Sequence, residues 1–222
     1  GKLDTLRRDI DQSGVMKGLD TFKQQALEMV AGDHVRKAFD IGSESSALRD
    51  KYGRHQYGQS ALLARRLVEA GTRCVTINTG YWDHHNEIEK GLEEHLPPLD
   101  QAIATLVEDL EDRGMLDDVL IVWMGEFGRT PTVQGSGMDG RDHNPWGFTM
   151  WLAGAGVQSG FSYGATDDYG FYAERDKMHI HDVHATLLHL LGIDHEKLTH
   201  RHAGRDFRLT DVFGNVAKEI LA

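Results

Sequence analysis

The clearest apolar pattern in the chain is the helical one over residues 96–114. Leucine, isoleucine and valine recur there every three or four residues, while acidic side chains occupy the other side. Pro97 and Pro98 suit the first turn of a helix, and Gly114 suits the residue that ends one. The pattern therefore predicts a long amphipathic helix.

Shorter helical patterns cover five other stretches: residues 1–30, 34–40, 57–70, 182–192 and 216–221. For residues 182–192, Asp182 is the expected N-cap. We interpret residues 1–54 as a helical lead-in segment within one domain that spans residues 1–222.

Two apolar stretches on either side of the long helix predict β-strands. Residues 73–78 are β-branched and apolar, and residues 119–124 form the uninterrupted apolar run of a strand buried on both faces. A strand, a helix and a strand at this spacing predict a parallel βαβ unit with a right-handed crossover. A third apolar run covers residues 148–153, and the glycine-rich residues 160–170 predict a hairpin. The expected fold class is therefore α/β with a mainly parallel sheet.

Polar side chains follow both predicted strands of this unit. Asp83 and His85 lie in the loop after residues 73–78, and Glu126 follows the apolar run 119–124. A non-periodic loop of about twenty residues comes next, a length that is usually functional or disordered. Because parallel strands end at the same edge of a sheet, the two loops are expected to converge.

Asp83, His85, Glu126 and His143 together form a mixed carboxylate and imidazole set. Such a set suits zinc, manganese or iron. In the alternative interpretation, each residue is an ordinary polar loop residue bonded to the backbone. His84 could replace His85 as a ligand, since adjacent side chains usually point to opposite sides.

Arg129 and Arg141 are candidates for holding an anionic substrate group through paired hydrogen bonds, although an arginine before Thr-Pro is also an ordinary structural residue. No G-x-S-x-G motif is present, and no serine or threonine is marked as an attacking group. The single cysteine, Cys74, lies in an apolar run and is expected to be a buried small hydrophobe. The chain thus offers ligands and anion-binding groups without a recognisable nucleophile.

Seven histidines gather in the C-terminal part of the chain: His179, His181, His184, His189, His195, His200 and His202. A second metal site is conceivable there, because His-x-His pairs in extended chain place two imidazoles on one face. Surface or capping histidines are the favoured interpretation.

Charge and hydropathy exclude two classes of partner. The formal net charge of −11 argues against nucleic-acid binding, which needs a basic surface. No run is long and apolar enough to span a bilayer. The chain begins at Gly1 without a signal peptide, so we expect a fragment that lacks an N-terminal part.

Several motifs resemble one bacterial family, the domain of unknown function 1501. They are LLARRLVEAG, YWDHHNE, LPPLDQAIATLVEDLEDRGMLDD, GEFGRTP, GRDHNPWG and DVHATLLHLLGIDHEKLTHRHAGRDFRLTDV. The resemblance covers about residues 55–215. It implies membership of the alkaline-phosphatase-like superfamily, with a three-layer α/β/α sandwich and two divalent metals.

The resemblance also implies roles for particular residues. Asp83 and His85 look like the first ligand pair and His143 like the later histidine, with zinc favoured and manganese, calcium or iron as alternatives. Glu126 stands where Asp-His is expected, and Phe127 cannot ligate, so one of the two metal sites would be altered or absent.

The implied function is metal-dependent hydrolysis of a sulfate or phosphate ester, in a small molecule or a glycan. The nucleophile and one ligand would lie in the missing N-terminal part, and the family suggests export from the cytoplasm. The alternative is a non-catalytic metal-binding or scaffold domain that keeps the fold without the reaction centre.

Overall fold

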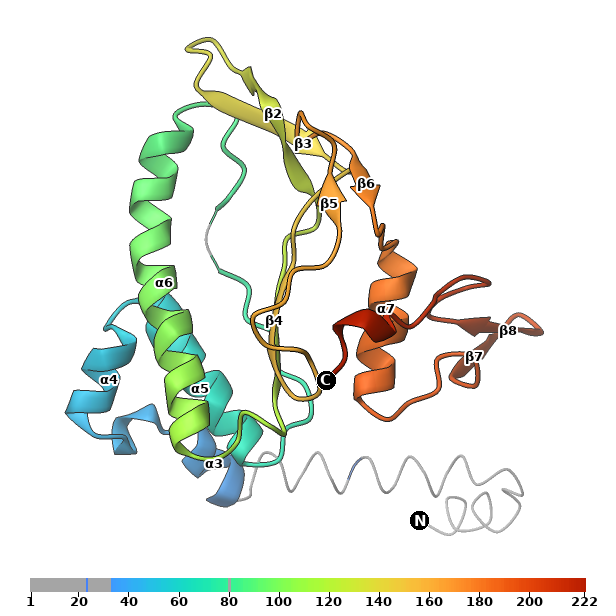
Figure 1. Ribbon diagram of the computed structural model, residues 1–222. Coiled ribbons are helices and arrows are strands. Elements are labelled where there is room, and N and C mark those ends of the chain that lie inside the picture. Colours follow the sequence, from blue (N-terminus) through green and yellow to red (C-terminus); the bar gives the residue numbers. More distant parts are fainter. Residues whose placement is uncertain (1–22, 24–32, 80) are drawn as a thin grey trace, which may run out of the picture. The chain divides into compact units, whose positions relative to one another are not determined.

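The computed structural model describes residue 23 and residues 33–79 and 81–222 (Figure 1). The helical pattern over residues 1–30 lies almost wholly outside this part of the chain. Two compact units emerge from the internal contacts. Of the described residues, the first contains those up to Thr79 together with residues 98–106, and the second contains residues 81–97 and 107–222.

The first unit is helical. Its elements are α3 (Asp33–Phe39), the 3-10 turn η1 (Ile41–Ser43), α4 (Ser46–Tyr52), α5 (Gln56–Glu69) and part of α6 (Ile88–Asp112). Tyr52, Ala61, Leu62 and Ala102 form its buried apolar cluster. The helices predicted over residues 34–40 and 57–70 are confirmed as α3 and α5.

Helix α6 confirms the predicted amphipathic helix but begins eight residues before Leu96. Pro97 and Pro98 lie inside the helix, so the prediction that they form its first turn is wrong. The apolar residues Ile88 and Leu92 extend the same spacing upstream, and Leu99 and Leu110 are buried on its apolar side. Gly114 follows the helix with a φ of 66°, as expected for a residue that ends one.

The predicted parallel sheet is wrong. Strand β1 (Leu120–Trp123) confirms the central strand, but it pairs antiparallel with β4 (Trp151–Gly154), placing Trp123 opposite Trp151. Residues 73–78 form no strand, so the βαβ unit is absent. Every strand pair in the described chain belongs to a short antiparallel two-stranded sheet. The three-layer α/β/α sandwich is therefore contradicted.

The sheet differs from the predicted one because the strand that pairs with β1 comes later in the chain than β1, not before it. The stretch predicted as a long loop folds into a hairpin of β2 (Gly128–Gln134) and β3 (Gly140–Asn144), which returns the chain toward β1. Cys74, in the segment without a strand, is exposed rather than buried. An apolar run alone does not reveal which partner it pairs with or in which direction.

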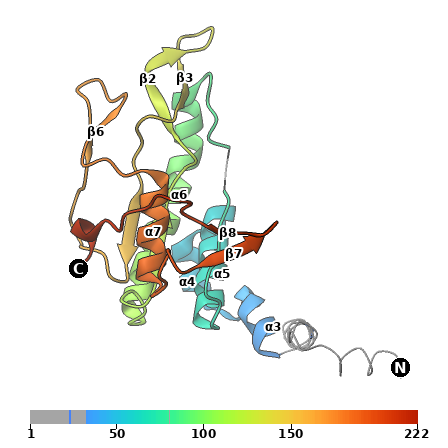
Figure 2. The same ribbon diagram turned by 90° about the vertical axis from the view of Figure 1, so that its right-hand side faces the viewer.

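The remaining elements follow β4. Strands β5 (Ala165–Thr166) and β6 (Ala173–Arg175) form a hairpin, but only β5 lies within the glycine-rich stretch 160–170 for which a hairpin was predicted. Beyond α7 (Ile180–Leu190), strands β7 (Thr199–His202) and β8 (Arg205–Arg208) run side by side (Figure 2), and η2 (Lys218–Ile220) is a 3-10 turn.

The N-terminus of α7 differs in detail from the prediction. His179, rather than Asp182, is the N-cap, and Asp182 is the third helical residue of a capping box. The carboxylate of Asp182 accepts the backbone N–H of His179 at 2.8 Å. In the part of the chain that the structure describes, no helix is long and apolar enough to cross a membrane.

Candidate metal centre

Three of the predicted metal ligands, Asp83 and His85 from one loop and His143 from about sixty residues later, lie together in the second unit. The Nε2 atoms of His143 and His85 lie 2.8 and 3.0 Å from Oδ1 of Asp83. One ligand atom from each residue falls within 4.8 Å of the other two. This is the one group of three potential metal-ligating side chains found among the described residues. One carboxylate and two imidazoles form a donor set that suits a divalent transition metal.

Local pairing brings the three residues together. His143 lies on β3, where the hairpin register places it opposite Arg129 of β2. The loop that carries Asp83 and His85 is joined to β3 because the N–H of Arg141 donates to the carbonyl of His84 at 3.0 Å. Gly140 permits this approach, since a Cβ there would lie 1.9 Å from the carbonyl oxygen of His85.

Arg129 completes the environment of Asp83. Its Nη1 donates to Asp83 Oδ1 at 2.7 Å, so one carboxylate oxygen faces a guanidinium and two imidazoles. The guanidinium carbon lies 5.5 Å from the centre of the Phe127 ring, and Nη2 lies 3.9 Å from Oε1 of Glu126. Arg129 is thus held over an aromatic ring and between two carboxylates.

These contacts keep Asp83 ionised. The hydrogen bond from His143, followed by that from Arg129, lowers the pKa of Asp83 to about 2, and the positive charge that His85 carries when it is protonated in acid adds to the effect. The carboxylate therefore needs no deprotonation at neutral pH before it binds a cation.

The hydrogen bond of His85 to Gln134 tests whether the residues fit a metal. Nδ1 of His85 lies 2.7 Å from Oε1 of Gln134, an acceptor, so Nδ1 carries the proton. In neutral His85 the Nε2 lone pair then faces the carboxylate oxygen of Asp83, and a cation between them removes the repulsion. A histidine ligand whose other nitrogen donates to a protein acceptor is the usual arrangement at metal sites. The residues fit a metal.

A family model described as a protein of unknown function (DUF1501) matches residues 3–221. The chain belongs to the DUF1501 family. This confirms the family expected from the sequence motifs. Comparison with curated proteins and with solved structures gave no match.

Other residues singled out in this DUF1501 chain lie at the edge of the group or away from it. Glu126 contacts Arg129 and its side chain is 68% exposed, and it is not among the three clustered ligands. Arg141 donates from Nη1 to the backbone carbonyl of Gly140 at 2.8 Å. Of the two adjacent histidines, His85 contacts Asp83, whereas the ring of His84 stacks on His95.

Gln134 was missed by the sequence analysis. It lies in a Thr-Val-Gln-Gly run with no feature of a metal site, and only the β2–β3 hairpin brings it to His85. The signal that could have revealed the hairpin was the glycine-rich Gly135–Gly140 stretch between two short polar strands.

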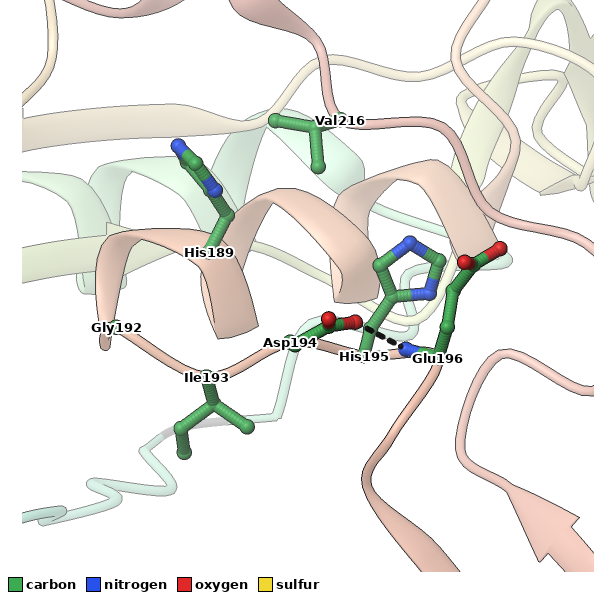
Figure 3. A pocket seen from close by; sticks show the side chains of 7 residues that line it. All are labelled: His189, Gly192, Ile193, Asp194, His195, Glu196 and Val216. Carbon is green, nitrogen blue, oxygen red and sulfur yellow. Dashed lines mark hydrogen bonds between the residues drawn. The ribbon is translucent and has the colours of Figure 1, made fainter.

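The C-terminal histidines form no comparable ligand group among the described residues. An open pocket of about 450 Å³ lies beside the C-terminal end of α7, where His189 projects from the helix and His195 from the following segment (Figure 3). His195 is bonded through Nδ1 to the hydroxyl of Thr210 at 3.0 Å, and Asp194 accepts the N–H of Glu196 at 3.0 Å. His195 and Asp194 thus already have structural partners.

Proposed function

We propose that this chain binds a divalent transition metal through Asp83, His85 and His143, and that the centre serves the hydrolysis of a sulfate or phosphate ester. The observation that carries the proposal is the convergence of the three ligand atoms within 4.8 Å. Zinc is the favoured ion because the donors are two imidazoles and one carboxylate, and manganese and iron accept the same set.

The proposed chemistry divides between the ion and the protein. A bound divalent metal would polarise the ester oxygen and lower the pKa of an attacking water. Asp83 stays ionised, and Gln134 holds the His85 ring with Nε2 toward Asp83. Arg129 presents a planar guanidinium beside the same carboxylate, and its fork of N–H donors matches the oxygens of a sulfate or phosphate group.

The substrate would carry its negative charge into an acidic chain. The net charge of −11 does not attract anions over long distances, so the local positive field of metal and Arg129 would have to dominate. Arg141 would contribute to that field from β3, although its own hydrogen bond is to the hairpin backbone. The relation to the alkaline-phosphatase-like superfamily remains part of this proposal.

A second candidate is a metal-binding or scaffold domain without catalysis. It is favoured by the contacts of the ligand group, since the side-chain bonds that the structure describes for Asp83, His85 and His143 join them to one another, to Arg129 and to Gln134. A covalent mechanism would need a hydroxyl or thiol nucleophile nearby.

Metal analysis combined with turnover separates the two candidates. The chain and its Asp83→Ala/His143→Ala variant would be loaded with zinc or manganese, desalted and assayed with aryl sulfate and aryl phosphate esters. Metal and turnover that are both lost in the variant support the hydrolase. Metal without turnover supports the non-catalytic metal-binding domain, and absence of bound metal in the unaltered chain contradicts both the hydrolase and the metal-binding role.

A further inference from the structure

The ring of His84 lies away from the ligand group although the residue sits between Asp83 and His85. It stacks on His95 with ring centres 5.9 Å apart and meets Tyr81 edge-on at 6.0 Å. Its Nε2 atom is buried and has no hydrogen-bond partner in the described structure. Burying a polar atom in this way costs free energy, so the position of the ring needs another explanation.

Gly91, in the first turns of α6, provides the space for that ring. A Cβ at residue 91 would lie 2.2 Å from Cε1, 2.5 Å from Nε2 and 2.6 Å from Nδ1 of His84. Glycine is a poorer helix former than alanine. Its presence at this helical position is explained by the imidazole packed directly against it.

The backbone of His84 is fixed to the opposite element. Its carbonyl accepts the N–H of Arg141, which lies on β3 two residues before His143. A second bond joins the N–H of Ile88, the first residue of α6, to the carbonyl of Asp139 at 3.1 Å. The ligand loop, which carries Asp83 and His85, is thus held between the start of α6 and the β3 side of the β2–β3 hairpin.

We propose that His84, packed against Gly91, is a positioning residue that aligns Asp83 and His85 with His143 for metal binding. The loop turns at His84, where the N–H of His85 donates to the carbonyl of Asp83 at 3.2 Å, and the His84 ring faces Gly91 while Asp83 and His85 face His143. Fixing the His84 ring against α6 therefore directs Asp83 and His85 toward β3. This inference rests on the proposed metal site and adds two residues, His84 and Gly91, that are not among its proposed ligands.

A cobalt(II) titration of four proteins tests the proposal: the unaltered chain, Gly91→Ala, His84→Ala and the double variant. We expect Gly91→Ala to weaken cobalt affinity about tenfold, the lower end of the effect of altering groups that orient ligands. Its thermal stability should not fall, because alanine favours the helix. The double variant should bind no more weakly than His84→Ala, since the added methyl group then has no ring to displace.

The matched control is His189→Ala, which removes an exposed histidine of α7 and should leave cobalt affinity unchanged. Affinities of Gly91→Ala and His84→Ala within twofold of the unaltered chain would overturn the positioning role. So would a loss caused by Gly91→Ala that persists in full when His84 is absent, because the effect would then not act through the ring.

A measurement without metal keeps this inference separate from the proposed function. The His85 Nδ1–H bond to Gln134 can be followed by NMR of the imidazole protons in the metal-free protein. We expect this signal to be lost or shifted in Gly91→Ala and kept in His189→Ala. If the chain binds no cobalt, the proposed function fails. An unchanged His85 signal in both Gly91→Ala and His84→Ala would reject the positioning role independently.

Discussion

Removing the acceptor that orients His85 is expected to weaken metal binding without unfolding the chain. In Gln134→Leu the 2.7 Å hydrogen bond from His85 Nδ1 is lost, so the ring can rotate and exchange tautomers. A neutral hydrogen bond contributes about 1 kcal/mol net, and about 1.4 kcal/mol corresponds to a tenfold change in affinity. Groups of this kind at known metal sites alter affinity by roughly 10–100-fold. We therefore expect a loss of about tenfold.

The assay is competitive zinc titration against a chromophoric chelator, with thermal unfolding measured on the same samples. Gln158→Leu is the matched control, because that glutamine also makes one side-chain amide bond, to the carbonyl of Leu221 at 2.9 Å. Gln134→Glu should bind zinc at least as tightly as the unaltered chain, since a carboxylate is a stronger acceptor for Nδ1–H. Equal zinc affinity in Gln134→Leu and Gln158→Leu would refute the reasoning.

Three further predictions concern stability. The pKa of Asp83 is lowered from 3.8 to about 2, so ionised Asp83 contributes to folding stability above pH 3.8, and this stability is lost as the pH falls toward 2. In the metal-free Asp83→Asn variant, acid titration of the unfolding free energy should not show this loss. Arg65→Ala breaks a buried pair with Glu44 at 2.8 Å and should cost about 3–5 kcal/mol in urea unfolding, against about 0–1 kcal/mol for exposed Arg36→Ala. Leu62→Ala, at a fully buried position, should cost about 2–5 kcal/mol, and a smaller loss would contradict the assigned core.

Much of the helical structure could be predicted from the sequence because apolar spacing and helix ends are local signals. Helix α5 and the body of α6 follow directly from those signals. The sheet could not be predicted in the same way, since β1 is an apolar run that fits a parallel or an antiparallel partner equally well. Its true partner, β4, is reached only after the intervening hairpin.

The meeting of Asp83, His85 and His143 was anticipated, but by an incorrect route. The prediction relied on two parallel strands ending at one edge, whereas the structure uses the β2–β3 hairpin and its bonds to the ligand loop. Glu126 was included because it follows β1, yet its side chain extends to Arg129 instead. Residue chemistry suggested the ligand types, while the geometry depended on pairing between strands that the sequence does not reveal.

The most direct test of the account is a cobalt(II) titration followed by visible absorption, because the intensity and position of the bands report the ligand set. The chain would be compared with His85→Ala, His143→Ala and the control His189→Ala. We predict about one tightly bound cobalt ion per chain in the unaltered protein and the control, and its loss in both site variants. Binding that is unchanged in His85→Ala and His143→Ala, or no binding by the unaltered chain, would contradict the assignment of Asp83, His85 and His143 as a metal centre.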